Sequence, residues 1–246
     1  MTSRTLRLSE GAEVRVIESG GGEPVLLIHG VGMRAEAWAP QIDALAATHR
    51  VIAVDMPGHG ESAPLPGRPD LPDYVGWAAR VILALGLGPV SLAGHSMGSL
   101  IAAGLAIERP DLVRRAALLN GVHRRSPEAR AAVLARAAEI AAGKGGIEAP
   151  LARWFGPEDE ALRMQVAGWL RAVSPEGYAA AYRAFAEGDA VYADRLARIA
   201  CPLLVLTGDG DANSTPAMTR AMAAMAPRGR AVVIEGHRHM ANLTAP

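Results

Sequence analysis

The pentapeptide Gly94-His95-Ser96-Met97-Gly98 places a serine between a short apolar run, residues 90–93, and a helical pattern that begins near Met97. A Gly-x-Ser-x-Gly at a junction of strand and helix forces a sharp turn, which lifts the serine hydroxyl above the sheet. Glycines are needed there because side chains would collide with the neighbouring strand and helix. The pentapeptide alone is a weak signal, but its flanks make it specific. We predict Ser96 as the nucleophile of an acyl-transfer enzyme.

A serine nucleophile needs a histidine base, which in turn is held by a carboxylate. After a nucleophile at such a turn, the acid comes next along the chain and the histidine last. Three histidines follow Ser96, and His123 comes too early for that order. His237 and His239 both follow the last apolar run, residues 231–234, and both remain candidates for the base on position alone.

The acid is expected after the apolar run of residues 203–206, which leads into Thr207-Gly208-Asp209-Gly210-Asp211. Asp209 suits a role within the turn, because an aspartate readily bonds nearby backbone. Asp211 stands just ahead of the helix that Pro216 opens, and we prefer it as the acid. The other possible acid position, after the run that ends at residue 119, carries Asn120 and no carboxylate.

His29-Gly30-Val31-Gly32 follows another apolar run, residues 24–28, and its glycines let the backbone turn an N–H toward a reacting carbonyl. We predict the backbone N–H groups of Val31 and Met97 as the oxyanion hole. Loss of one such donor typically costs about 2.7–4 kcal/mol of transition-state stabilisation. His29 and His95 are expected to serve structure rather than catalysis.

Apolar runs alternate with helical patterns along most of the chain. The runs cover residues 24–29, 50–54, 90–93, 116–119, 203–206 and 231–234, and the helical patterns cover residues 35–48, 73–87, 97–108 and 216–225. This alternation predicts an α/β protein with a mostly parallel sheet and helices on both faces, opened by an antiparallel hairpin around Glu10.

Residues 122–189 contain only Ala-rich helical segments. We predict that they form a helical cap inserted after the sixth strand, over the carboxyl edge of the sheet where α/β proteins bind ligands. Residues 1–121 and 190–246 then form the core.

Composition excludes several classes of function. The 246 residues carry 25 basic and 25 acidic side chains, so no positive field exists to attract nucleic acid. The most apolar stretch, residues 81–94, is short and broken by glycine and proline, which argues against a membrane span. We expect a soluble cytoplasmic protein with a small-molecule substrate and no cofactor, because no phosphate-binding glycine motif is present. Asp55, His59 and Glu61 lack a second cluster of metal ligands, so we expect no metal.

Taken in order, these motifs resemble the α/β-hydrolase superfamily over essentially the whole chain. They are H-G-x-G at residue 29, D-x-P-G-H-G-x-S at residue 55, G-H-S-M-G at residue 94, G-D-x-D at residue 208, and the terminal histidine. The resemblance favours His239 over His237, because Met240-Ala241-Asn242-Leu243 matches the run after the base in related sequences. Arg153-Trp154-Phe155 and Pro175-Glu176-Gly177-Tyr178 look like cap residues of 3-oxoadipate enol-lactonases, although those enzymes often have glycine in place of Ser99.

The resemblance implies a serine hydrolase that cleaves a small carboxylic ester or (enol-)lactone through an acyl-enzyme. Trp154, Phe155 and Tyr178 would select the substrate, and Arg124, or else Arg125 or Arg153, would meet a carboxylate unless these arginines are merely solvated. A carbon–carbon bond hydrolase of ring-cleavage products uses the same triad and is one alternative. Another is a ligand-sensing protein on a retained hydrolase fold. The sequence leaves the substrate and the oligomeric state open.

Overall fold

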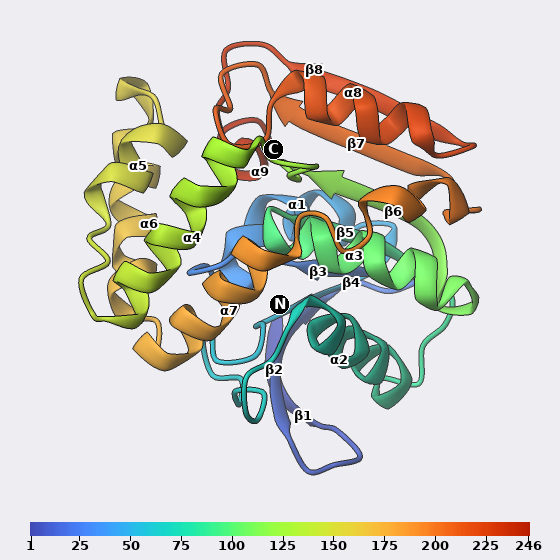
Figure 1. The fold of residues 1–246 in the computed structure, drawn as a ribbon. Coiled ribbons are helices and arrows are strands. Elements are labelled where there is room, and N and C mark those ends of the chain that lie inside the picture. The colour runs from blue at the N-terminus through green and yellow to red at the C-terminus, as the bar shows by residue number, and fades with distance from the viewer.

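An eight-stranded sheet runs through the computed structural model, which describes residues 1–246 (Figure 1). The strand order is β1-β2-β4-β3-β5-β6-β7-β8, with β1 and β2 antiparallel to their neighbours and every later pairing parallel. The strands are β1 (Thr2–Arg7), β2 (Glu13–Ser19), β3 (Glu23–Ile28), β4 (His49–Val54), β5 (Val90–His95), β6 (Val113–Leu119), β7 (Leu203–Gly208) and β8 (Gly229–Ile234).

Helices cover both faces of this sheet, because its central strands are apolar on both sides. In β3, Val25 and Leu27 pack in a cluster with Ile42 of α1, whereas Leu26 and Ile28 belong to the larger core with α2 and α3. Successive side chains of a strand point to opposite faces, so a continuous apolar run requires cover on both. The covering helices are α1 (Ala39–Leu45), α2 (Leu71–Ala84), α3 (Met97–Glu108), α8 (Pro216–Met225) and the short α9 (Ala241–Thr244). The predicted α/β fold class is confirmed.

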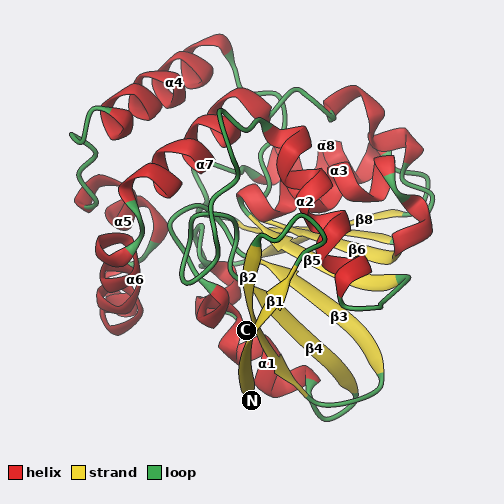
Figure 2. Ribbon diagram, turned by 90° about the horizontal axis from the view of Figure 1, so that it is seen from below, coloured by secondary structure: helices red, strands yellow, loops and turns green.

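Four helices stand between β6 and β7, where the helical insertion was expected. They are α4 (Pro127–Ala141), α5 (Glu148–Trp154), α6 (Glu160–Ala172) and α7 (Pro175–Gly188). Figures 1 and 2 show α4, α5 and α6 together beside one end of the sheet. α7 packs against both α4 and α2, and so joins the insertion to the rest of the molecule. The boundaries of the cap at residues 122 and 189 stay a prediction.

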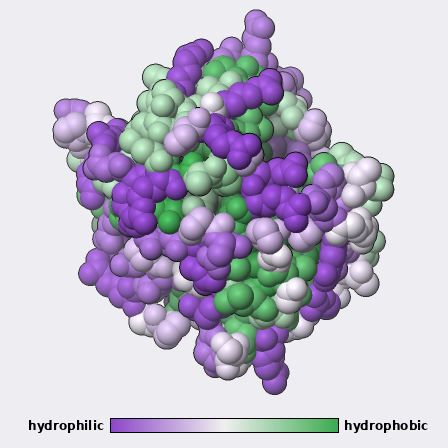
Figure 3. All heavy atoms as spheres, turned by 90° about the vertical axis from the view of Figure 1, so that its right-hand side faces the viewer, coloured by the Kyte–Doolittle hydropathy of each residue, from purple (hydrophilic) through white to green (hydrophobic).

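None of the helices combines the length and the apolar character needed to cross a membrane. The face drawn in Figure 3 is hydrophilic over most of its area, with a hydrophobic region below its centre. The large apolar side chains that are exposed come from separate elements: Met1, Leu83, Leu134, Met164 and Val191.

Candidate active site

Ser96 occupies the turn between β5 and α3 in a backbone conformation that side chains rarely adopt. Its φ is 54° and its ψ is −114°. A methyl group on Gly94 would stand 1.9 Å from the carbonyl oxygen of Gly98, and one on Gly98 would stand 2.2 Å from that of Ile28. Only glycine fits these two positions, and the tight packing around them holds Ser96 in its strained conformation.

The structure brings Ser96, His239 and Asp211 into one chain of hydrogen bonds. His239 Nδ1 lies 2.8 Å from Asp211 Oδ2, and His239 Nε2 lies 3.1 Å from Ser96 Oγ. Since a carboxylate only accepts, Nδ1–H donates to Asp211 and Nε2 is free to accept the serine proton. The three residues follow β5, β7 and β8, and all three are buried. Their catalytic roles stay predictions, and the geometry is that required of a nucleophile, base and acid.

Asp211 is held by several donors besides His239. Its Oδ2 accepts a hydrogen bond from Asn120 Nδ2 at 2.8 Å, and its Oδ1 accepts from the backbone N–H groups of Asn213 and Ser214 at 2.8 and 3.1 Å. Burial alone would raise the pKa of Asp211, but the imidazolium form of His239 and hydrogen bonds from His239, Asn120 and the Ser214 N–H lower that pKa to about 2. Asp211 therefore stays ionised and can stabilise an imidazolium.

Asn120 is a site residue that sequence reasoning missed. After β6 only a carboxylate was expected to take part in the site, whereas the side chain there donates a hydrogen bond to one. Asn120 is fully buried with φ of 50°, and its Nδ2 reaches both Asp211 and Thr207. An amide at the alternative acid position is the signal that could have found it.

The two alternatives to the preferred acid and base lie outside this chain of hydrogen bonds. Asp209 Oδ1 accepts the Gly236 N–H at 2.9 Å and so ties one loop to the next. His237 Nδ1 lies 2.9 Å from Thr244 Oγ1. Neither side chain contacts Ser96, so the structure favours Asp211 and His239.

His95 hydrogen-bonds the backbone of the candidate base. Its Nε2–H donates to the carbonyl oxygen of His239 at 2.8 Å, and the two rings have centroids 5.1 Å apart. Burial lowers the pKa of His95 to about 3, so this imidazole is neutral near pH 7. We infer a positioning role for His95, which the sequence led us to expect in a structural role.

The loop that carries Val31, one of the two predicted oxyanion donors, lies against the nucleophile. A methyl group on Gly30 would stand 2.9 Å from the Ser96 Cβ. The Val31 N–H makes no hydrogen bond within the protein. Met97 is the first residue of α3, and the first N–H groups of a helix have no carbonyl partner within it. The Val31 N–H, next to Gly30, and the Met97 N–H, next to Ser96, thus both lack a backbone partner, and their role as oxyanion donors stays a prediction.

Two buried histidines join this loop to the neighbouring loop of residues 55–62 by reciprocal hydrogen bonds. His59 Nε2 accepts the Gly32 N–H at 3.0 Å, and His29 Nε2 accepts the Met56 N–H at 2.9 Å. Each ring donates its Nδ1–H to a carbonyl oxygen of its own loop, that of Gly30 or Pro57. Burial lowers the pKa of His29 to about 4 and that of His59 to about 3, so both are neutral acceptors near pH 7.

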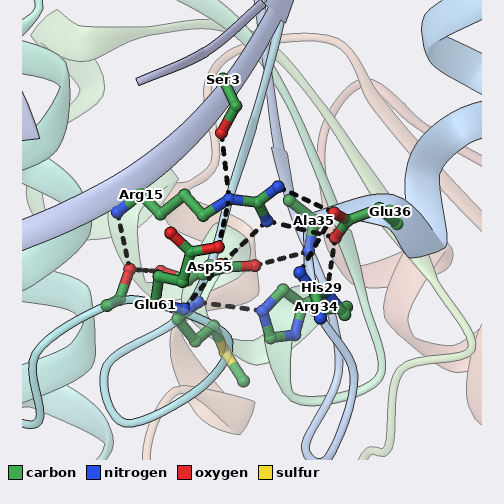
Figure 4. A network of polar contacts seen from close by, with 10 residues as sticks. Ser3, Arg15, His29, Arg34, Ala35, Glu36, Asp55 and Glu61 are labelled. Carbon is green, nitrogen blue, oxygen red and sulfur yellow. Dashed lines mark hydrogen bonds and ion pairs between the residues drawn. The ribbon is translucent and has the colours of Figure 1, made fainter. Parts of the chain in front are cut away.

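A buried ionic network anchors the same two loops from the other side (Figure 4). Asp55, which is fully buried, accepts the Ala35 N–H on Oδ1 at 2.7 Å and Arg15 Nη1 on Oδ2 at 3.2 Å. Arg15 also pairs with Glu36 at 2.8 Å. The oxygens of Asp55 are therefore already used within the protein. The sequence did not reveal the role of Arg15, because Arg15 and Asp55 are 40 positions apart along the chain.

Two of the three aromatic residues predicted for substrate contact lie at the site. The Trp154 ring centroid is 5.6 Å from that of His239, with 31° between the planes. A ring carbon of Tyr178 lies 3.1 Å from where a Cβ on Gly32 would stand. Phe155 is buried in the core, and its carbonyl oxygen accepts from Arg238 Nη1 at 2.7 Å.

Arg124 is not brought to the site. It is half-exposed and pairs with Asp194, a residue of the segment that leads to β7.

Comparison with known proteins identifies the family. Residues 25–246 match the model of the alpha/beta hydrolase family. The chain is 53% identical over its whole length, and over 94% of the relative, to the (E)-2-((N-methylformamido)methylene)succinate hydrolase of Acinetobacter baylyi.

Two solved structures are similar over the whole length of the chain. One is a thermophilic esterase from Thermogutta terrifontis with malate bound, at 28% identity and a TM-score of 0.89, covering 100% of this chain and 94% of that one. The other is the enol-lactonase from Burkholderia xenovorans, at 26% identity and a TM-score of 0.88, covering 98% and 95%. With its fold, its nucleophile turn and a family match over nearly all of its length, this chain belongs to the α/β-hydrolase family, and it is a hydrolase.

Proposed function

We propose that this hydrolase uses Ser96 to cleave the acyl–nitrogen bond of a small unsaturated dicarboxylate that carries an N-formyl group. The observation that carries the serine mechanism is the unbroken hydrogen-bond chain from Asp211 through His239 to Ser96. The substrate rests on the 53% identity with the hydrolase of Acinetobacter baylyi, whose name specifies a formamide attached to a methylene-succinate.

The chemistry begins with proton transfer from Ser96 Oγ to His239 Nε2 as the oxygen attacks the formyl carbon. Asp211 keeps the imidazole in the tautomer that accepts this proton and stabilises its cationic form. The N–H groups of Val31 and Met97 stabilise the charge that develops on the carbonyl oxygen.

His239 then gives its proton to the departing nitrogen, whose electron pair is delocalised through the alkene onto a carboxylate. Water then attacks the formyl-serine while His239 takes its proton, and His239 returns that proton to Ser96 Oγ as formate leaves. One water is consumed, and formate and an amine are released.

Ester or lactone cleavage is a second candidate. The esterase of Thermogutta terrifontis and the enol-lactonase of Burkholderia xenovorans are similar in structure over the whole chain, although they are less similar in sequence than the Acinetobacter baylyi relative. The same three residues support acyl–oxygen cleavage, because an ester carbonyl is attacked in the same way.

The test measures formate release from (E)-2-((N-methylformamido)methylene)succinate, beside turnover of short-chain esters and an enol-lactone. We expect repeated turnover with a kcat/KM highest for the formamide. Ser96→Ala should lower turnover by about 10⁶-fold, the scale of losing a protease nucleophile. Ser91→Ala, on β5 ahead of the nucleophile turn, is the control and should retain most of the activity. Esters or the lactone outperforming the formamide would replace our proposal with the second candidate, and a single slow cycle would indicate a sensor.

A further inference from the structure

Arg125 is a buried arginine whose guanidinium is only partly satisfied. Its side chain is 6% exposed, and its Nη1 lies 3.3 Å from Asp189 Oδ1. The guanidinium carbon lies 4.4 Å from the centroid of the Phe185 ring. Nη2 is buried and has no hydrogen-bond partner in the protein. Because leaving a charged donor buried and unpaired is costly, this Nη2 indicates that an acceptor from outside the chain belongs here.

The surroundings of Arg125 carry more positive than negative charge. Asp189, itself buried, is shared between Arg125 and Arg130, whose Nη1 lies 2.9 Å from it. Burial raises the pKa of the neighbouring Tyr182, and the guanidinium groups of Arg136, Arg153 and Arg125 oppose that rise.

Glu139 is the carboxylate whose charge adds to the rise in the pKa of Tyr182, and it pairs with Arg136 at 3.2 Å. Arg125 and Arg130 thus share one carboxylate, and Glu139 is the one carboxylate set against the three guanidinium groups that act on Tyr182, so a further anion would be attracted.

A row of aromatic rings on α7 connects this cluster to the candidate active site. The ring centroids of Phe185 and Tyr182 are 5.9 Å apart, and those of Tyr182 and Tyr178 are also 5.9 Å apart. Tyr178 in turn packs on Gly32 in the loop with the predicted oxyanion donor. Arg125 also lies five residues after Asn120, which bonds Asp211. α7 thus contacts the loop of Val31 through Tyr178, near the start of the helix, and Arg125 through Phe185, near its end.

We infer that Arg125 receives a carboxylate of the substrate through its free Nη2, and that it sets a preference for acyl compounds with a carboxylate remote from the scissile bond. This inference rests on the proposed hydrolase function and specifies its substrate class. Arginine suits the role because its planar donors match a carboxylate. Succinate, named in the Acinetobacter baylyi relative, supplies two such groups.

The test compares two esters with the same leaving group, p-nitrophenyl acetate and the p-nitrophenyl monoester of succinate. We expect the native enzyme to prefer the anionic ester. Arg125→Met should lower that preference by about 10²-fold, the loss expected for a charge-assisted hydrogen bond, mainly through KM. Arg125→Lys keeps the positive charge but loses the planar pair of donors. Its preference for the anionic ester should lie between that of the native enzyme and that of Arg125→Met.

Arg130→Met is the matched control, because it removes a guanidinium from the same Asp189 while leaving Nη2 of Arg125 unchanged. Its preference for the anionic ester should stay close to the native value. A second readout needs no turnover: succinate binding to the Ser96→Ala protein, by calorimetry, should disappear when Arg125→Met is added.

Failure of the proposed function and failure of this inference give different results. Absence of formamide turnover contradicts the proposed function. The preference for the anionic ester and the binding of succinate still test the role of Arg125 in that case. If Arg125→Met slows both esters equally and leaves succinate binding intact, Arg125 is only a structural residue and the inference is wrong.

Discussion

At the candidate acid, two aspartates two positions apart have separate sets of hydrogen-bond partners. Asp211 faces His239, and Asp209 faces the Gly236 N–H on the exposed side of the turn. Composition and spacing could only rank them, because both stand in a Gly-rich turn after the same strand. The structure separates them by depth: Asp211 is 2% exposed, whereas Asp209 lies on the surface.

We predict that Asp211→Asn lowers turnover by about 10⁴-fold while the fold is retained, because an amide favours the wrong histidine tautomer. Asp209→Asn should leave turnover nearly unchanged and cost roughly 1 kcal/mol or less of stability, the value of one exposed hydrogen bond. Turnover and melting temperature of both variants decide the matter. A collapse of turnover in Asp209→Asn alone would reassign the acid.

At the scale of elements, the sequence predicted the order of strands and helices well where local signals are strong. The helical patterns at residues 97–108 and 216–225 coincide with α3 and α8. The helix expected at 73–87 begins instead at Leu71, because Asp70 caps it and exchanges hydrogen bonds with Asp73. The helix expected at 35–48 is divided into a 3-10 turn and α1, which has a proline in its first turn.

Contacts between elements could not be predicted in the same way. Arg15 meets Asp55 across 40 positions, and Asn120 meets Asp211 across 91. Such pairs are set by the sheet order, in which β2 lies beside β4 and β6 beside β7. A single sequence shows neither that order nor which polar side chains it brings together. The nucleophile turn, in contrast, is local, and it could be recognised from five residues together with the strand and helix patterns on either side of them.

The reciprocal hydrogen bonds of His29 and His59 lead to a prediction about the oxyanion loop. His59→Ala removes the acceptor of the Gly32 N–H and leaves that donor buried, a loss of about 1–3 kcal/mol. Because the loop also carries the Val31 N–H, we expect kcat to fall while KM changes little. His59→Gln, which can supply an acceptor again, should recover part of the loss.

The control for this prediction is His49→Ala on β4, whose ring hydrogen-bonds the neighbouring Thr48 at 2.8 Å. It should leave kcat near the native value. If His59→Ala lowers stability and leaves kcat unchanged, the hydrogen bonds between the two loops serve the fold and do not position the oxyanion donor.

At the scale of the whole molecule, the site is built on buried neutral histidines, and this makes stability depend on pH. Burial lowers the pKa of His29 to about 4 and those of His59 and His95 to about 3. In the unfolded chain each histidine takes up a proton near pH 6.5. The unfolded state therefore binds more protons than the native state between about pH 6.5 and 4, so stability falls as the pH falls through that window.

Each of these histidines should lower the free energy of unfolding by about 1.4 kcal/mol per pH unit once the pH is well below 6.5. Asp211 and Glu36, whose pKa values are lowered to about 2, add to the loss only below about pH 4. Urea unfolding at pH 7, 6 and 5 should therefore show a steepening decline in the free energy of unfolding. His59→Gln should make this decline shallower by about one histidine's share. A free energy that stays constant from pH 7 to 5 would mean that these histidines titrate normally in the native protein, and that the hydrogen bonds we assign to their neutral rings are wrong.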